Sequence, residues 1–205
     1  MTSPANGKSS KSLAAAAALR AMGGWKMDDC GHLPRRAVCL AVPHTDNMDG
    51  LLLVLLAKSV GMPISWMVKD VWTKRPVIGT MVRAAGGVGV DRTKAHGLVG
   101  SMIEEFERRE DLYLVIPPEG TRSLTKHWKS GFYRIALGAN VPVVPSYLDY
   151  ANRRGGFGPA IDMTGDVKTD MDAIRAYYGD RAPAMAKYPD RFGPMLLREE
   201  LSDED

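Results

Sequence analysis

The chain has 205 residues, of which 45% are hydrophobic and 25% charged, a balance typical of a folded globular protein rather than a disordered one. The length fits one compact domain, large enough to build its core without disulfides or a structural metal. The net charge of +3 is too small for binding nucleic acid by charge density alone, so we expect no nucleic-acid partner.

The N-terminus is basic and the C-terminus acidic. Residues 1–36 hold six Lys and Arg against two Asp, and residues 190–205 hold two Arg against six acidic residues. We expect a mobile tail over 1–12, an N-terminal helix over 13–27 and an acidic tail over 191–205. The helix would either lie in the headgroup layer of an anionic membrane or pack on the domain.

Between these ends, apolar strand-like runs alternate with helical patterns. In chain order we expect a strand over Arg36–Val42, a helix over Met48–Val60, a strand over Ser65–Val68, a helix over Val77–Ala85, a strand over Val88–Val90, a helix from Thr93 through Arg109, a strand over Tyr113–Ile116, a helix over Gly131–Leu137, a strand over Val143–Tyr147 and a helix over Asp170–Tyr178.

This alternation predicts an α/β fold, with a single layered domain over 36–190 and a mostly parallel central sheet flanked by helices. In such folds the functional groups lie on loops that leave the carboxyl ends of the strands. No apolar run approaches the roughly 20 residues of a membrane-spanning helix, so we expect a soluble or peripheral protein. The two cysteines form no recognisable pair, which fits a reducing cytoplasm.

The first candidate site is His44 with Asp49, directly after the first strand of the domain. Five residues apart on one ideal helix, their side chains would point about 140° apart and could not meet, so His44 must precede the helix. With Thr45 or Asp46 as the N-cap, Asp49 can fold back, fix the imidazole tautomer and leave the other nitrogen free as a general base. The alternative is a plain helix start beside a loop histidine.

The second candidate is the sequence PPEGTRS, Pro117 to Ser123, which follows the apolar strand Tyr113–Ile116. Gly120 permits a sharp turn, and Thr121 and Arg122 supply a hydroxyl and a guanidinium suited to a phosphate. The alternative is an ordinary strand-to-helix turn with a surface arginine. A third segment, GGVGVDR, ends at Arg92 and is a weaker signal, since three glycines alone do not define a nucleotide site.

The sequence lacks the motif of a serine-hydrolase elbow, and neither Cys30 nor Cys39 has a partner motif of a reactive thiolate. No spaced cluster of metal ligands occurs either. The base would therefore have to activate a hydroxyl of the substrate, and we expect no metal and no cofactor.

Together these residues resemble the PlsC-type glycerolipid acyltransferases, the 1-acyl-glycerol-3-phosphate acyltransferase (lysophospholipid acyltransferase) family. The matching residues are, in order, His44 and Asp49 of an H-x-x-x-x-D motif, Gly86, Gly87 and Arg92 of a second block, Glu119 to Ser123 of an E-G-T-R-S block, and Val141 to Pro145 of a fourth. The resemblance covers about residues 36–149, within a short branch of the family.

The resemblance implies a glycerol-3-phosphate acyltransferase-like fold and direct attack of an acceptor hydroxyl on an acyl thioester. His44 would be the base and Asp49 its orienting group. Arg92, Glu119, Gly120, Thr121 and Arg122 would form the site for the acceptor's phosphate. The implied partners are acyl-CoA or acyl carrier protein as donor and a lysophospholipid or glycerol phosphate as acceptor, in the cytoplasm or at the inner face of the cell membrane. The alternatives are a non-catalytic module that binds anionic lipid and a thioesterase.

Overall fold

The computed structural model describes residues 10–90 and 97–201. Its helices are α1 (Ser10–Ala21), α2 (Asn47–Ser59), α3 (Asp70–Thr73), α4 (Pro76–Ala85), α5 (Gly97–Arg108), α6 (Gly131–Gly138), α7 (Val167–Tyr178) and α8 (Ala182–Met185). Its strands are β1 (Lys26–Met27), β2 (Arg36–Ala41), β3 (Ile64–Lys69), β4 (Gly87–Val90), β5 (Leu112–Ile116), β6 (Val143–Asp149) and β7 (Arg154–Phe157). Short 3₁₀ turns cover 179–181, 189–191 and 198–201.

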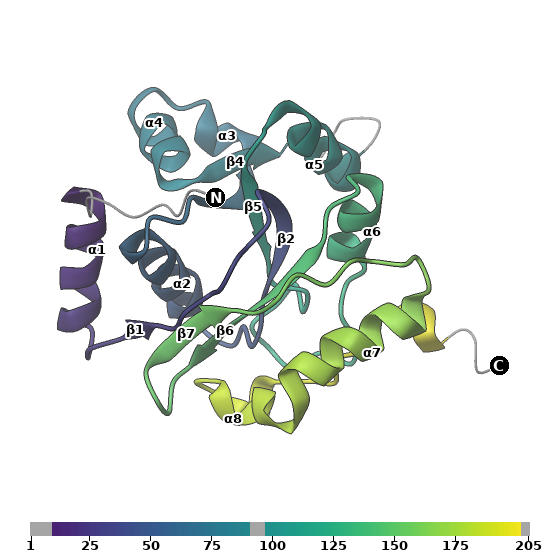
Figure 1. The fold of residues 1–205 in the computed structure, drawn as a ribbon. Helices are drawn as coiled ribbons and strands as arrows, with labels where there is room; N and C mark the ends of the chain where they lie inside the picture. The colour runs from purple at the N-terminus through teal and green to yellow at the C-terminus, as the bar shows by residue number, and fades with distance from the viewer. Residues whose placement is uncertain (1–9, 91–96, 202–205) are drawn as a thin grey trace.

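The strands form a single sheet in the order β1-β7-β6-β2-β5-β3-β4 (Figure 1). Each neighbouring pair is parallel except β6 and β7, which are antiparallel. The predicted α/β class with a mostly parallel sheet is confirmed. Parallel strands place their carboxyl ends at one edge, so the loops after β2 and β5, which are neighbours in the sheet, emerge side by side.

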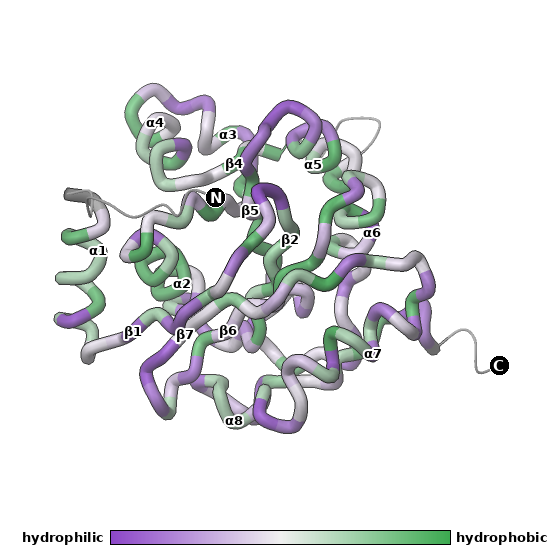
Figure 2. Tube along the Cα trace, in the orientation of Figure 1, coloured by the Kyte–Doolittle hydropathy of each residue, from purple (hydrophilic) through white to green (hydrophobic). Residues whose placement is uncertain are grey.

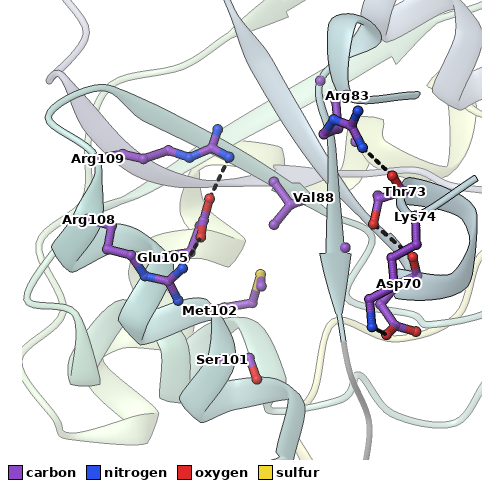
Figure 3. Close-up of a pocket in the computed structure, with 13 residues that line it drawn as sticks. Asp70, Thr73, Lys74, Arg83, Val88, Ser101, Met102, Glu105, Arg108 and Arg109 are labelled. Carbon is purple, nitrogen blue, oxygen red and sulfur yellow. Dashed lines mark hydrogen bonds and ion pairs between the residues drawn. The ribbon is translucent and has the colours of Figure 1, made fainter. Parts of the chain in front are cut away.

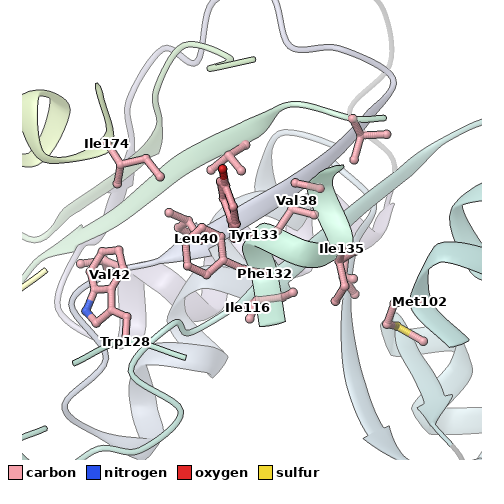
Figure 4. Close-up of a cluster of buried hydrophobic side chains, with 14 of the residues drawn as sticks. Val38, Leu40, Val42, Met102, Ile116, Trp128, Phe132, Tyr133, Ile135 and Ile174 are labelled. Atoms are coloured by element: carbon pink, nitrogen blue, oxygen red, sulfur yellow. The ribbon is translucent and has the colours of Figure 1, made fainter. Parts of the chain in front are cut away.

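Helices cover both faces of the sheet, with α1 and α2 on one side and α5, α6 and α7 on the other (Figure 1). Successive side chains of a strand point to opposite faces, so β2 contributes to both layers. Val38 and Leu40 belong to the larger core cluster, in which Phe132 and Ile174 pack from the helices (Figure 4). Cys39 faces the smaller core cluster, which lies beneath α2. In Figure 2 the trace of α2 is coloured as largely hydrophobic.

The N-terminal segment differs from the expected helix over 13–27. The helix α1 ends at Ala21, and Lys26 and Met27 form the edge strand β1, which pairs with β7 and so extends the sheet before residue 36. Leu19 and Trp25 are buried against α2. The side of α1 that carries Leu19 therefore packs on the domain, the second of the two alternatives.

The C-terminal segment also differs from the expectation of an acidic tail over 191–205. Leu197 is fully buried and pairs as an isolated bridge with Trp128. Glu200 forms an ion pair with Arg175 of α7, with a nitrogen-to-oxygen distance of 2.8 Å. Residues up to 201 are therefore part of the folded domain. No helix among the described residues is long and apolar enough to cross a bilayer.

Candidate active site

His44 lies in the loop between β2 and α2, before the helix begins, as its spacing from Asp49 required. Its Nδ1 lies 3.4 Å from Asp49 Oδ2. Asp46 is the N-cap of α2, and its side chain accepts a hydrogen bond from the Met48 backbone N–H. Asp49 completes a reciprocal capping box with Asp46, which orients the carboxylate toward the histidine.

Asp49 is buried and its carboxylate is fully engaged. Oδ2 accepts the backbone N–H groups of Thr45 at 2.7 Å and Asp46 at 2.8 Å, and Oδ1 accepts the Tyr150 hydroxyl at 2.5 Å. Burial raises the pKa of Asp49, but the hydrogen bonds from His44, Tyr150 and the two backbone groups outweigh it and leave the pKa below its ordinary value. The carboxylate is thus held ionised beside the imidazole.

The other ring nitrogen of His44 is available for chemistry. The side chain is 17% exposed, and within the described part of the chain Nε2 has no hydrogen-bond partner. Because Nδ1 is directed at Asp49, Nε2 is the ring nitrogen positioned to accept a proton from a substrate. The pair therefore has the geometry of a general base with its orienting group.

Glu119 connects the two candidate loops. Its Oε1 accepts the backbone N–H of His44 at 3.1 Å, so the loop after β5 is fastened to the loop after β2. Its Oε2 is buried and has no hydrogen-bond partner among the described residues. Burial raises the pKa of Glu119, and the nearby charge of Asp49 raises it further. Backbone hydrogen bonds lower it in part, and the resulting pKa is about 8. This carboxyl group is therefore largely protonated at neutral pH.

The predicted phosphate loop turns sharply at Gly120, whose φ is +64°. A side chain at this position would be strained by the backbone alone, and its Cβ would lie 2.7 Å from Cδ of Lys129. The aliphatic stem of Lys129 therefore crosses the turn. Thr121 and Arg122 are exposed just beyond it, with the Thr121 hydroxyl accepting the Ser123 N–H.

The structure thus brings together His44, Asp49 and Glu119 and places Gly120, Thr121 and Arg122 on the adjoining loop. Arg92 lies outside the described residues. In the fourth block, Val143 and Val144 are fully buried core residues of β6, as their apolar character suggested.

Three contacts at the site were missed by sequence reasoning. They are the hydroxyl of Tyr150, the stem of Lys129, and the segment 187–191, whose Lys187 pairs with Asp46 at 3.2 Å and whose Tyr188 N–H bonds to the Thr45 hydroxyl. Tyr150 lies 101 residues from Asp49, so no local pattern reports their contact. The only signal was the position of Tyr150 just beyond the carboxyl end of β6, next to β2 in the sheet.

A separate hollow of about 400 Å³ lies between α3, β4 and α5 (Figure 3). Its lining includes Arg109, paired with Glu105 at 2.5 Å, and Lys74, paired with Asp70 at 2.6 Å. Gly86 and Gly87 of the second block line it, whereas His44, Asp49 and the loop 119–122 do not, and its lining holds four basic residues against two acidic ones.

Comparison with known proteins gives a consistent result. The family model described as Acyltransferase matches residues 28–149, more than half of the chain. A 1-acyl-sn-glycerol-3-phosphate acyltransferase of Escherichia coli is 30% identical over 108 residues, which cover 50% of this chain and 42% of the relative. A probable 1-acyl-sn-glycerol-3-phosphate acyltransferase of Mycoplasma pneumoniae is 27% identical over 119 residues, covering 56% and 45%.

Among solved structures, that of the PlsC lysophosphatidate acyltransferase from Thermotoga maritima superimposes with a TM-score of 0.58 at 15% identity. The match covers 80% of this chain and 74% of that one, and it supports the fold alone. The fold and the paired loops after β2 and β5 define an α/β domain with its candidate site at the carboxyl edge of the sheet. By its family match, the chain belongs to the acyltransferase family. It spans a little under half the length of the curated relatives named above.

Proposed function

We propose that the protein is an O-acyltransferase that moves a fatty acyl group from an acyl thioester to a hydroxyl of a lysophosphatidate-type acceptor. The observation that carries the proposal is the arrangement of His44. Its Nδ1 lies 3.4 Å from the buried carboxylate of Asp49, and its Nε2 has no hydrogen-bond partner among the residues that the structure describes. A neutral imidazole in a fixed tautomer is suited to remove a proton from an alcohol. The names of the relatives support the acceptor class.

In the proposed reaction, His44 Nε2 removes the proton of the acceptor hydroxyl as its oxygen attacks the thioester carbonyl carbon. The new carbon–oxygen bond forms, the carbon–sulfur bond breaks, and the departing thiolate takes the proton from the imidazolium. The products are an ester and a free thiol, and no acyl-enzyme is needed. Asp49 stabilises the transient imidazolium because its carboxylate stays ionised beside Nδ1.

The exposed Arg122, with Gly120 and Thr121, is proposed to hold the acceptor's phosphate on the loop that Glu119 fastens to His44. A guanidinium pairs well with phosphate because it offers several fixed donors. Arg92 of the second block is proposed to join them. Holding the acceptor beside the base would contribute up to roughly 7 to 11 kcal/mol through proximity.

The donor is proposed to be acyl-CoA or acyl carrier protein, and the reaction to take place in the cytoplasm or at the inner face of the cell membrane. Both cysteines are free thiols, as in a reducing compartment.

The test follows thiol release from acyl-CoA with and without a lysophosphatidate acceptor, together with the fate of the acyl chain. The proposal predicts release that depends on the acceptor and a phosphatidate product. Free fatty acid released without an acceptor would identify a thioesterase instead. Binding of lipid without turnover across donors and acceptors would favour a non-catalytic lipid-binding module.

A further inference from the structure

The helical hairpin of α3 and α4 presents an apolar surface to solvent. We call this surface the α3–α4 face, and it consists of five exposed side chains: Val71, Trp72, Val77, Ile78 and Met81. Val77 is 72% exposed and Met81 67%, and both lie on α4, which has hydrophobic (green) stretches in Figure 2. Apolar side chains gathered on one surface element indicate a binding surface.

The packing of α4 reverses the usual arrangement of a surface helix, in which apolar residues face the core. Its one buried residue is Gly79, where an added Cβ would lie only 2.2 Å from the Thr73 carbonyl oxygen. The guanidinium of Arg83 also turns back onto this carbonyl and donates a hydrogen bond to it. The close approach of α3 thus occupies the inner side of α4, and Val77, Ile78 and Met81 are left outside.

Basic residues flank the face. The segment Lys69–Ala85 contains four Lys and Arg against one Asp, a net charge of +3, equal to that of the whole chain. Lys69 and Arg75 are exposed, and the Arg75 guanidinium lies over the Trp72 ring at 4.6 Å from its centroid. Exposed apolar side chains with a tryptophan and a cationic rim are complementary to the surface of an anionic bilayer.

The hairpin that carries the α3–α4 face also leaves the sheet at the same edge as the candidate active site. β3 ends at Lys69 and α3 begins at the next residue, so the hairpin leaves the carboxyl edge of the sheet. β2 and β5 reach the same edge, where they lead to His44 and Glu119. The N-terminal helix is a weaker candidate because Leu19 and Trp25 pack inward, and Leu13 is its one strongly exposed large apolar side chain among the described residues.

We propose that the α3–α4 face docks on an anionic phospholipid bilayer, with Val77, Ile78 and Met81 among the acyl chains and Lys69 and Arg75 at the headgroups. Docking by itself does not need the proposed reaction. The purpose of docking would be to bring a membrane-embedded acceptor to the edge of the sheet where His44 lies, and this purpose rests on the proposed function.

The test is flotation of the full chain with vesicles of phosphatidylcholine containing phosphatidylglycerol, compared with phosphatidylcholine alone. The wild type should float with the anionic vesicles. Val77→Ser/Met81→Ser should weaken this binding by about tenfold or more, since two apolar side chains lose their burial. Lys69→Gln/Arg75→Gln should reduce the preference for anionic vesicles. Thermal melts check that each variant is folded.

Two control variants test whether the α3–α4 face is the surface that docks on the bilayer. Val60→Ser changes an exposed apolar residue just beyond the C-terminal end of α2. Leu13→Ser changes the exposed apolar residue of α1. Both variants should bind as the wild type does. The proposal is overturned if the α4 variant binds normally, or if Leu13→Ser removes binding instead. It is also overturned if the wild type does not float but forms dimers that the α4 variant dissociates, which would assign the face to a second copy.

Activity separates this proposal from the proposed function. On a short-chain lysophosphatidate that stays monomeric in solution, Val77→Ser/Met81→Ser should keep the wild-type rate, whereas on vesicle-embedded acceptor it should be slower. A wild type that floats but never transfers an acyl group would contradict the reaction and leave the docking intact.

Discussion

The hydroxyl of Tyr150 is the contact that separates the site from a simple histidine–aspartate pair. It donates to Asp49 Oδ1 at 2.5 Å, while its ring packs edge-on against Trp25, with centroids 5.0 Å apart. The N-terminal segment thus supports a residue that orients the carboxylate. We regard Tyr150 as a positioning residue that acts on the base through Asp49.

Tyr150→Phe should lower kcat about three- to tenfold and leave the acceptor KM nearly unchanged, because Asp49 loses a donor worth about 1 kcal/mol. The Tyr150 hydroxyl is one of the groups that lower the pKa of Asp49, so its removal should also let that pKa rise toward its ordinary value. The matched control is Tyr147→Phe, which removes a similar hydroxyl-to-carboxylate hydrogen bond, from Tyr147 of β6 to Asp28. Equal loss of kcat in both variants would show a general effect on folding.

The buried carboxyl group of Glu119 leads to a prediction of how the stability of the protein depends on pH. Its pKa rises from 4.5 to about 8 on folding, so the folded state favours the protonated form. The corresponding stability is present below about pH 4.5 and is lost as the pH rises toward 8. Glu119→Gln should therefore be more stable than the wild type at pH 8 by about 1 to 3 kcal/mol, the range for a buried group left unpaired.

Denaturant unfolding at a series of pH values measures this difference. The advantage of Glu119→Gln should shrink as the pH falls and be gone near pH 4.5. A constant difference between the two proteins across the range would mean that Glu119 does not titrate in the folded state.

At the scale of elements, the turn at Gly120 positions the candidate phosphate loop. Gly120→Ala adds a side chain at a φ of +64°, which costs about 1 to 2 kcal/mol, and pushes against Lys129. We expect the acceptor KM to rise several-fold, with a smaller change in kcat, in steady-state kinetics. Gly165→Ala is the control, because Gly165 also has a positive φ but lies in the loop before α7. A larger kcat effect than KM effect would contradict a binding role for this turn.

At the scale of the whole molecule, residues 192–201 complete the core opposite α2. Leu197→Ala should lower the free energy of unfolding by about 2 to 5 kcal/mol, as for other buried leucines. Leu124→Ala, at a residue 64% exposed, should change it by less than about 0.5 kcal/mol. Denaturant melts of the two variants measure both values. Similar melts for both would place the C-terminal segment outside the cooperative unit.

The fold was largely predictable because its central strands are continuous apolar runs separated by helical patterns. β1 was missed because it is only two residues long. β7 was missed because its sequence, RGGF, has one large apolar residue and two glycines, which pack beneath Leu56 and Tyr147. The proximity of His44 to Asp49 followed from local spacing. Contacts of Asp49 with Tyr150 and of Thr45 with Tyr188 depend on the order of strands and on the path of the C-terminal segment, which local patterns do not encode.

The central claim is that His44 is the base for acyl transfer to a hydroxyl. The most direct measurement compares phosphatidate formation by the wild type and by His44→Ala, with acyl-CoA and lysophosphatidate as substrates. General-base catalysis predicts that the variant stays folded and loses about 10² to 10⁴ in rate. A folded His44→Ala protein that forms phosphatidate at close to the wild-type rate would contradict the account.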